Sequence, residues 1–278
     1  MPEVRSRGAR IRYEDVGQGD TALLLVPGWC TSRAIFAPLL SQLSARHRVL
    51  SVDLRGHGQS EQGGEAFTSD TLVDDLLAVL QASGVRQVVP VAPSHAGWLA
   101  LELRRRLGER VRGLVLLDWL IVDPPRAFLE ALKGLRSESW KGSRDALFRQ
   151  WLEGVDSADI TRFVEEDMGV FGEDMWRRAG QEIASAYARE GYPLRALSAL
   201  VPPVPVVHLY SQPESPEYLM AQQSFAADHP WFQVVKLRAR SHFPTLEVPD
   251  EVAENIERFL AASVAGDEAS PGDGVGAS

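Results

Sequence analysis

The sequence has one cysteine, Cys30, only three lysines and no long apolar segment. A single cysteine excludes an intramolecular disulfide and favours a reducing compartment. No apolar run approaches the ~18 residues that a membrane span needs, and the Arg-rich stretch 1–11 lacks the apolar region of a secretory signal. We therefore expect a soluble, cytoplasmic protein without a membrane partner.

Signatures of bound cofactors are lacking as well. The sequence contains no H-E-x-x-H, no paired cysteines and no carboxylate–histidine spacing typical of a metal site. No G-x-G-x-x-G opens a helix after a strand, so a dinucleotide site has no support. With 29 basic and 38 acidic residues the net charge is −9, which makes nucleic acid a poor partner. We expect no metal, no cofactor and no nucleic acid.

The sequence shows the alternation of strand-like and helix-like segments that is typical of an α/β fold. With 278 residues, 45% of them hydrophobic, it can bury a large core. Short apolar runs alternate with helical periodicity, which predicts a mostly parallel sheet with helices on both faces. The runs are Leu23–Val26, Arg48–Asp53, Gln87–Ala92, Gly113–Trp119, Val204–Tyr210 and Phe232–Arg238, and the helical stretches are Phe36–Leu43, Thr71–Ser83, Trp98–Leu107 and Asp250–Ala262.

The alternation is interrupted between residues 124 and 200. This segment predicts only helices, and a helical insertion between two strands is typical of a cap over the carboxyl edge of the sheet, where such folds bind ligands. We expect a core formed by residues 1–123 and 201–265, a cap formed by 124–200, and a disordered tail over 266–278. The expected cap helices are Arg126–Leu135, Asp145–Leu152, Ala158–Val170 and Asp174–Arg189.

The segment Val91–Trp98 predicts a sharp turn between a strand and a helix, with Ser94 at its tip. Such a turn presents the serine above the sheet, and the amide of the next residue, His95, can face a negative oxygen. The crowded positions two before and two after the serine hold Ala92 and Ala96 instead of the usual glycines. An ordinary helix-capping serine is the alternative for this segment taken alone.

Three further segments favour a catalytic role. Pro27-Gly28-Trp29 ends a strand where α/β-hydrolases supply a second oxyanion amide, here that of Trp29. The segment Asp53–Ser60 is a loop typical of α/β-hydrolases, and His242 follows the last strand, where such folds place their catalytic histidine. The order serine, acid, histidine is that of an α/β-hydrolase triad.

Two carboxylates are candidates for the acid. Asp118 ends the strand after Ser94, whereas Glu214 lies in the loop after the next strand, where many α/β-hydrolases keep their acid. A carboxylate is needed in either case because it fixes the histidine tautomer and stabilises the imidazolium. Asp118 lies directly at a strand end and hence on rigid scaffold, which favours it. The alternative interpretations are a strand-end cap for Asp118 and a solvated loop charge for Glu214.

The remaining histidines and the tryptophans are less specific. We interpret His57 as a structural part of its loop, leave the side chain of His95 open between the pocket and a sideways position, and expect structural or surface roles for His47, His208 and His229. Tryptophans in one cleft would suit a flat aromatic substrate, with core packing as the alternative. Those considered are Trp29, Trp98, Trp119, Trp140, Trp151 and Trp176.

Several strings together resemble the cofactor-independent 2,4-dioxygenases of 3-hydroxy-4(1H)-quinolones, a family with the α/β-hydrolase fold that includes enzymes for 2-alkyl signal molecules. The likeness runs from about residue 24 to 260, cap included. The strings are Pro27-Gly28-Trp29-Cys30, Ser94-His95-Ala96-Gly97-Trp98, Leu117-Asp118-Trp119-Leu120, Phe148-Arg149-Gln150-Trp151-Leu152, Tyr210-Ser211-Gln212-Pro213, His229-Pro230-Trp231-Phe232 and Ser241-His242-Phe243-Pro244.

The resemblance implies a role for each site residue. His242 would be the general base and Asp118 its partner, which selects Asp118 over Glu214. Ser94 would hydrogen-bond the substrate, Trp29 and His95 would supply oxyanion amides, and Trp151 would border the pocket. The chain departs from the 2-methyl-specific relatives at two positions that hold histidine there, since it has Thr31, which we place in the pocket, and Pro93.

The implied reaction needs no cofactor. O2 would cleave the heterocycle of a 3-hydroxy-4(1H)-quinolone, with 2-heptyl-3-hydroxy-4(1H)-quinolone as the expected type of substrate, and give an N-acylanthranilate and carbon monoxide. The alternatives are a serine esterase or amidase that uses Ser94 as nucleophile, and a non-catalytic ligand-binding relative. The oligomeric state is left open.

Overall fold

The computed structural model describes residues 1–64 and 66–263 and contains an eight-stranded sheet in the order β1-β2-β4-β3-β5-β6-β7-β8. Strands β3 to β8 are parallel, whereas β1 and β2 pair antiparallel at one edge. The α/β fold expected from the sequence is therefore confirmed. The strands are β1 Glu3–Ser6, β2 Ala9–Val16, β3 Thr21–Leu25, β4 Arg48–Val52, β5 Gln87–Pro93, β6 Leu114–Leu117, β7 Val206–Tyr210 and β8 Phe232–Lys236.

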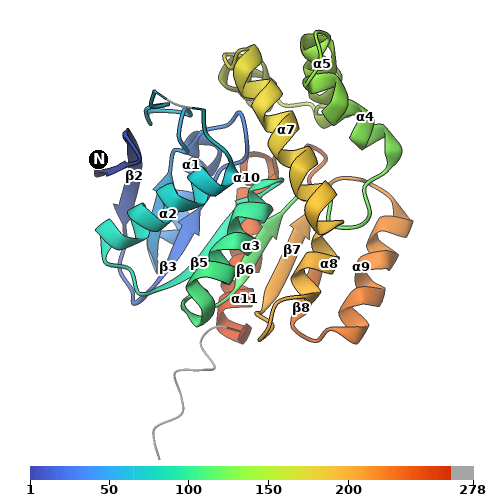
Figure 1. The fold of residues 1–278 in the computed structure, drawn as a ribbon. Coiled ribbons are helices and arrows are strands. Elements are labelled where there is room, and N and C mark those ends of the chain that lie inside the picture. The colour runs from blue at the N-terminus through green and yellow to red at the C-terminus, as the bar shows by residue number, and fades with distance from the viewer. Residues whose placement is uncertain (65, 264–278) are drawn as a thin grey trace, which may run out of the picture.

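Helices cover both faces of the sheet (Figure 1), and none in the described part of the chain is long and apolar enough to cross a membrane. Helices α2 and α3 pack together on one face, and α1 and α11 pack together on the other. These helices and those at the end of the sheet are η1 Arg33–Phe36, α1 Ala37–Leu43, α2 Ser69–Ser83, α3 Ala96–Leu107, η2 Gly108–Arg110, α9 Pro216–Asp228, α10 Pro244–Glu247 and α11 Pro249–Ser263.

The expected helical insertion lies between β6 and β7, and α4, α5 and α7 stand over one edge of the sheet (Figure 1). Two of its helices differ from the expectation. The helix expected over Asp145–Leu152 begins earlier, at Trp140, and the one expected over 158–170 is α6 followed by a π-helical turn. The insertion comprises α4 Arg126–Leu135, α5 Trp140–Trp151, α6 Ala158–Arg162, η3 Phe163–Met168, α7 Glu173–Glu190 and α8 Pro193–Ser198.

The division into a core and a cap at residues 124 and 200 stays a prediction, and the expected tail over 266–278 lies outside the described residues. The N-terminal hairpin β1–β2 was not expected from the sequence. Its signal is alternation: Ala9, Ile11 and Tyr13 of β2 are buried, as in a strand with one face on the core. Arginines and acidic residues between them hide the pattern.

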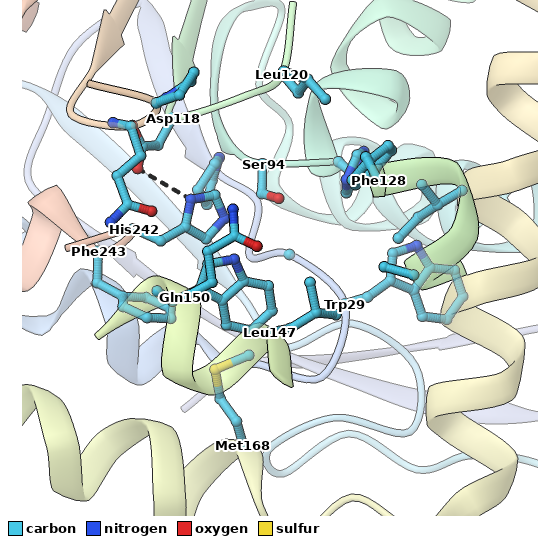
Figure 2. Close-up of a pocket in the computed structure, with 18 of the residues that line it drawn as sticks. Trp29, Ser94, Asp118, Leu120, Phe128, Leu147, Gln150, Met168, His242 and Phe243 are labelled. Atoms are coloured by element: carbon cyan, nitrogen blue, oxygen red, sulfur yellow. Dashed lines mark hydrogen bonds and ion pairs between the residues drawn. The ribbon is translucent and has the colours of Figure 1, made fainter. Parts of the chain in front are cut away.

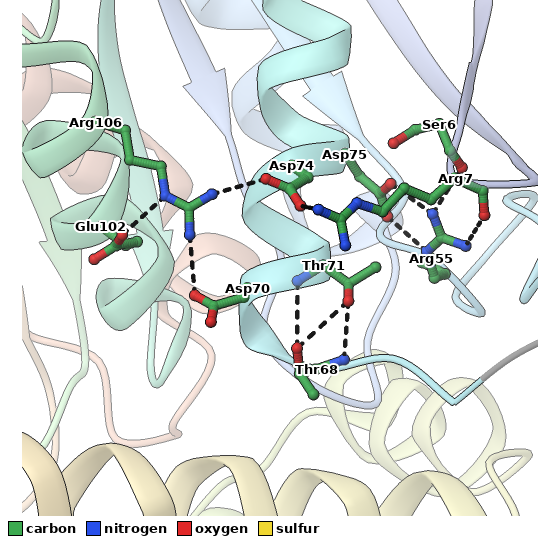
Figure 3. Close-up of polar contacts among 10 residues, drawn as sticks. All are labelled: Ser6, Arg7, Arg55, Thr68, Asp70, Thr71, Asp74, Asp75, Glu102 and Arg106. Carbon is green, nitrogen blue, oxygen red and sulfur yellow. Dashed lines mark hydrogen bonds and ion pairs between the residues drawn. The ribbon is translucent and has the colours of Figure 1, made fainter.

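Ion pairs attach the hairpin and α3 to α2 (Figure 3). The guanidinium of Arg55 donates to both oxygens of Asp75 at 2.8 and 2.7 Å and to the Ser6 carbonyl at 2.8 Å, and both charged side chains are buried. At the surface, Arg106 of α3 pairs with Asp70 and Asp74 of α2. Exposed pairs contribute at most about 1 kcal/mol each, whereas removing one partner of a buried pair costs about 3–5 kcal/mol. The buried pair therefore fixes the Arg55 guanidinium, which holds the hairpin through the Ser6 carbonyl.

Gly97, next to the Ser94 turn, is required by the packing of Trp119. A Cβ on Gly97 would lie 2.2 Å from the Trp119 ring, a contact that forces the ring or helix to move. We expect Gly97→Ala to lower the free energy of unfolding by about 1–3 kcal/mol, measured by urea denaturation. Gly142→Ala in α5 is the control: its Cβ meets nothing within 4 Å, so a gain of about 0.5–1 kcal/mol is expected. Equal effects of the two substitutions would contradict this account.

Candidate active site

A cavity of about 710 Å³ lies between the carboxyl ends of the strands and the inserted helices. Figure 2 shows Ser94, Asp118 and His242 at one end of it, with Phe128 further along. The sheet side carries most of the polar lining residues, whereas the side formed by the inserted helices is mainly apolar apart from Gln150 and Glu153. Its lining includes Trp29, Thr31, Ser94, His95, Asp118, Gln212, Arg240 and His242 from the first part, and Phe128, Ala131, Leu132, Leu135, Leu147, Trp151, Met168, Trp176 and Ile183 from the second.

Ser94 lies on a strained turn directly after β5. Its φ angle is +51°, a left-handed conformation that costs a residue with a side chain of order 1–3 kcal/mol. The neighbouring structure holds the turn: the Ser94 amide donates to the Leu117 carbonyl at 2.7 Å, and the Gly97 amide donates to the Ser94 carbonyl at 3.1 Å. The strain presents the hydroxyl to the cavity.

Asp118 ends β6 in a similar left-handed conformation, with a φ angle of +46°, and its side chain is fully buried. Four donors surround the carboxylate. Oδ1 accepts from the amides of Ser211 at 2.6 Å and Gln212 at 2.9 Å, and Oδ2 faces the Ser211 hydroxyl at 2.9 Å and His242 Nδ1 at 3.1 Å. Such bonds satisfy a buried charge that would otherwise be costly.

His242 is held by Asp118 on one side and Trp151 on the other. Its Nδ1 faces Asp118 Oδ2, and its ring stacks on the Trp151 ring with centroids 5.1 Å apart and planes 16° apart. Because Nδ1–H donates to the carboxylate, the tautomer leaves Nε2 free to accept a proton. Glu214, the other candidate acid, also lines the cavity but is exposed and makes no contact with His242. The geometry pairs His242 with Asp118.

The amides of Trp29 and His95 lie at this end of the cavity, and neither donates to any residue in the described part of the chain. His57 fixes the turn that carries Trp29. Its Nε2 accepts from the Cys30 amide at 3.0 Å, and its Nδ1 donates to the Arg55 carbonyl at 2.8 Å. The structural interpretation of His57 thus fits its contacts. The two amides can receive a negative oxygen.

Two further residues singled out from the sequence, Thr31 and His95, line the cavity. The Thr31 hydroxyl is buried and donates to the Gly28 carbonyl at 2.8 Å. The His95 ring points toward the inserted helices, where it stacks on Phe128 at 5.4 Å and meets the edge of Tyr187 at 5.8 Å. Burial, with the charge of His242 as a smaller cause, lowers the pKa of His95 to about 3. His95 is therefore neutral at pH 7.

The tryptophans divide between the cavity and the core. Trp29, Trp151 and Trp176 line the cavity, but Trp98 and Trp119 form a buried edge-to-face pair at 4.9 Å below it. These two pack the Ser94 turn against the sheet. A ring of tryptophans around the substrate is therefore only partly present.

Sequence reasoning missed several lining residues. Phe128, Leu135 and Ile183 line the cavity from α4 and α7. Their signal is the apolar stripe of each helix, which cannot say whether it faces a core or a cavity. Ser211 belongs to the string Tyr210-Ser211-Gln212-Pro213, but nothing in that string predicts its contact with Asp118. Within the described part of the chain, no group of three or more His, Cys, Asp or Glu could hold a metal ion.

The chain matches the model of the Alpha/beta hydrolase family over residues 23–255, so it belongs to that family. It is 36% identical to a 2-heptyl-3-hydroxy-4(1H)-quinolone dioxygenase of Mycobacteroides abscessus, covering 92% of this chain and 96% of that one. It is 33% identical to the 1H-3-hydroxy-4-oxoquinoline 2,4-dioxygenase of Pseudomonas putida, covering 94% and 100%. The chain therefore belongs to the 3-hydroxy-4-quinolone dioxygenases within the α/β hydrolase family.

A solved structure supports the same family membership. It shows a variant of AqdC in complex with its substrate, in a study of recognition and ring cleavage of the Pseudomonas quinolone signal. The TM-score is 0.90 at 35% identity, with 94% of this chain and 98% of that one covered. The resemblance given by the sequence strings is thus confirmed over nearly the whole chain.

The buried neutral state of His57 predicts a pH dependence of stability. Burial lowers the pKa of His57 to about 4, below the ~6.5 of an unfolded chain, so the unfolded state binds a proton first as the pH falls. The stabilisation is complete above pH 6.5 and is lost toward pH 4.

Between pH 7.5 and 5, His57 should contribute a loss of about 2 kcal/mol in the free energy of unfolding. His57→Gln removes this contribution, whereas the lowered pKa values of His95, about 3, and His208, about 4, remain in both proteins. Urea denaturation at the two pH values should therefore show a smaller loss for the variant. Equal losses would contradict the neutral assignment.

Proposed function

We propose that this protein is a cofactor-independent dioxygenase that cleaves the heterocycle of a 2-alkyl-3-hydroxy-4(1H)-quinolone, of which 2-heptyl-3-hydroxy-4(1H)-quinolone is the expected type. The products are the N-acylanthranilate and carbon monoxide. The observation that carries the proposal is the pair of Asp118 and His242 at the polar end of an apolar cavity. The relatives named for this substrate support it.

The first step is removal of the 3-hydroxyl proton by Nε2 of His242. Asp118 supports the step because its carboxylate stabilises the imidazolium that forms, and the stacked Trp151 ring keeps the imidazole in place. A positioned base typically contributes roughly 10²–10⁴-fold. The substrate anion is then electron-rich enough to reduce O2 itself, the task for which most oxygenases use a metal or flavin.

The second step joins O2 to the substrate anion. One oxygen bonds to carbon 2 and the other closes onto carbon 4; the O–O bond and both bonds to carbon 3 break, and carbon 3 leaves as carbon monoxide. The proton on His242 returns to the product. The amides of Trp29 and His95 receive the negative oxygen during these steps, and the Ser94 hydroxyl donates a hydrogen bond to the substrate.

The inserted helices receive the alkyl group. Ala131, Leu135 and Ile183 line the cavity from α4 and α7, and an alkyl chain placed against them leaves water at a gain of about 0.8 kcal/mol per buried CH2. In this proposal residues 124–200 act as a cap on the core of 1–123 and 201–265. The single cysteine supports a cytoplasmic location.

A serine hydrolase is the competing function. It would use a hydrogen bond between the Ser94 hydroxyl and His242. Among the described residues the Ser94 hydroxyl has no hydrogen-bond partner, His242 included. Activation of serine by histidine uses such a bond, which is often looser in a ligand-free site, and its absence here supports the other role. Ser94 is therefore assigned to substrate binding.

Substitutions separate the two functions. We expect Ser94→Ala to retain at least about a tenth of the wild-type kcat, because one hydrogen bond to substrate is lost. His242→Ala should lose at least about 100-fold, because the base is removed. His229→Ala, which removes a ring stacked on Phe225 away from the cavity, is the matched control. Loss of nearly all turnover in Ser94→Ala would favour the hydrolase.

Dependence on O2 tests the proposed reaction directly. Purified protein treated with a chelator is incubated with 2-heptyl-3-hydroxy-4(1H)-quinolone in air and under argon. We expect consumption in air, with one carbon monoxide released per substrate, and none under argon. Equal consumption in both atmospheres, or none in either, would exclude this reaction for this substrate.

A further inference from the structure

Ser211 occupies the position after β7 where many α/β-hydrolases hold their acid, and each of its polar groups has a partner. Its amide donates to Asp118 Oδ1 at 2.6 Å, its hydroxyl faces Asp118 Oδ2 at 2.9 Å, and its carbonyl accepts from Lys236 Nζ. The side chain is 1% exposed. The end of β7 thus holds no acid itself but supplies hydrogen-bond donors to Asp118 at the end of β6.

The Ser211 hydroxyl has a second acceptor. Its oxygen lies 2.5 Å from the carbonyl oxygen of Ser241, the residue that precedes His242. A hydroxyl has one hydrogen to donate, so it serves either the carboxylate or this carbonyl at any moment. Ser211 therefore joins the acid to the loop that carries the base.

That loop is fixed from its other side as well. The amides of Arg240 and Ser241 donate to the two oxygens of Glu247 at 2.9 and 2.7 Å. Ser241 is thus held by Glu247 through its amide nitrogen and by Ser211 through its carbonyl oxygen, and the His242 amide donates to the Trp151 carbonyl at 3.4 Å. The orientation of this segment decides where the imidazole lies relative to Asp118.

We propose that Ser211 is a positioning residue that acts through Asp118 to hold the His242 base in its productive orientation. Its hydrogen bond shares the carboxylate charge while His242 is neutral. When His242 takes the substrate proton, the hydroxyl hydrogen turns to the Ser241 carbonyl, and Oδ2 is left to the imidazolium. The inference rests on the proposed function, in which His242 is the base.

A double-mutant cycle tests this role. Activity is measured as oxygen-dependent loss of 2-heptyl-3-hydroxy-4(1H)-quinolone for wild type, Ser211→Ala, Asp118→Ala and the double variant. A hydrogen bond to a charged group typically contributes enough for a loss of about tenfold, so we expect Ser211→Ala to lose about tenfold in kcat with KM within about twofold. In the Asp118→Ala background, the same substitution should cost less than about twofold.

A matched control comes from α10. The Thr245 hydroxyl is buried near His242 but has no hydrogen-bond partner in the described part of the chain. Thr245→Val removes it with little change of shape, and kcat should stay within about twofold of wild type. Ser211→Thr keeps a hydroxyl and should recover most of the lost kcat. If the alanine variant does not fold, Ser211→Cys, which replaces the hydroxyl by a weakly donating thiol, takes its place in the cycle with the same expected loss.

Two results would overturn the inference. One is an undiminished kcat in Ser211→Ala, and the other is a further tenfold loss when Ser211→Ala is added to Asp118→Ala. A loss in Thr245→Val equal to that in Ser211→Ala would likewise show a general packing effect. If His242→Ala kept wild-type activity, the proposed function itself would fail, so the two failures are distinguishable.

Discussion

The buried carboxylate of Asp118 is the constraint on which the rest of the site depends. A charge without water is costly unless donors surround it, and here two amides, a hydroxyl and an imidazole do so. These donors come from the ends of β7 and β8, so the parallel order of the strands is what gathers them. The carboxylate in turn fixes the tautomer of His242. The Asp118 carboxylate thus depends on the fold for its donors and in turn orients His242.

Moving the acid from β7 to β6 separates this site from an ordinary hydrolase triad. In the structure the His242 ring contacts Asp118 and the Trp151 ring, and among the described residues no hydrogen bond joins it to the Ser94 hydroxyl. The oxyanion amides of Trp29 and His95 remain useful because oxygenation also places negative charge on oxygen. In the proposed function the same scaffold serves proton abstraction instead of acyl transfer.

The strands that carry the site were predictable because buried parallel strands are continuous apolar runs. The six expected runs correspond to β3 to β8, and Ser94, Asp118 and His242 lie after the ends of β5, β6 and β8. The hairpin β1–β2 was missed since charged side chains interrupt its apolar alternation. In the insertion, the apolar faces predicted helices but could not tell which side chains line a cavity.

The choice between Asp118 and Glu214 is one that sequence spacing does not decide. Both follow strands whose carboxyl ends meet at one edge, so spacing alone cannot separate them. What decides is three-dimensional: Asp118 is buried with four donors, whereas Glu214 is exposed. Ser211 is a similar case, because its contacts join segments that are far apart in the chain.

The central claim, that His242 supported by Asp118 takes the substrate proton, can be observed before O2 reacts. Under argon the absorption spectrum of 2-heptyl-3-hydroxy-4(1H)-quinolone is recorded at pH 7 with excess wild-type protein and with excess His242→Ala. The account predicts the red-shifted spectrum of the deprotonated quinolone with wild type and that of the neutral molecule with the variant, although both bind it. A neutral spectrum with wild type, or an anion spectrum with both, would contradict it.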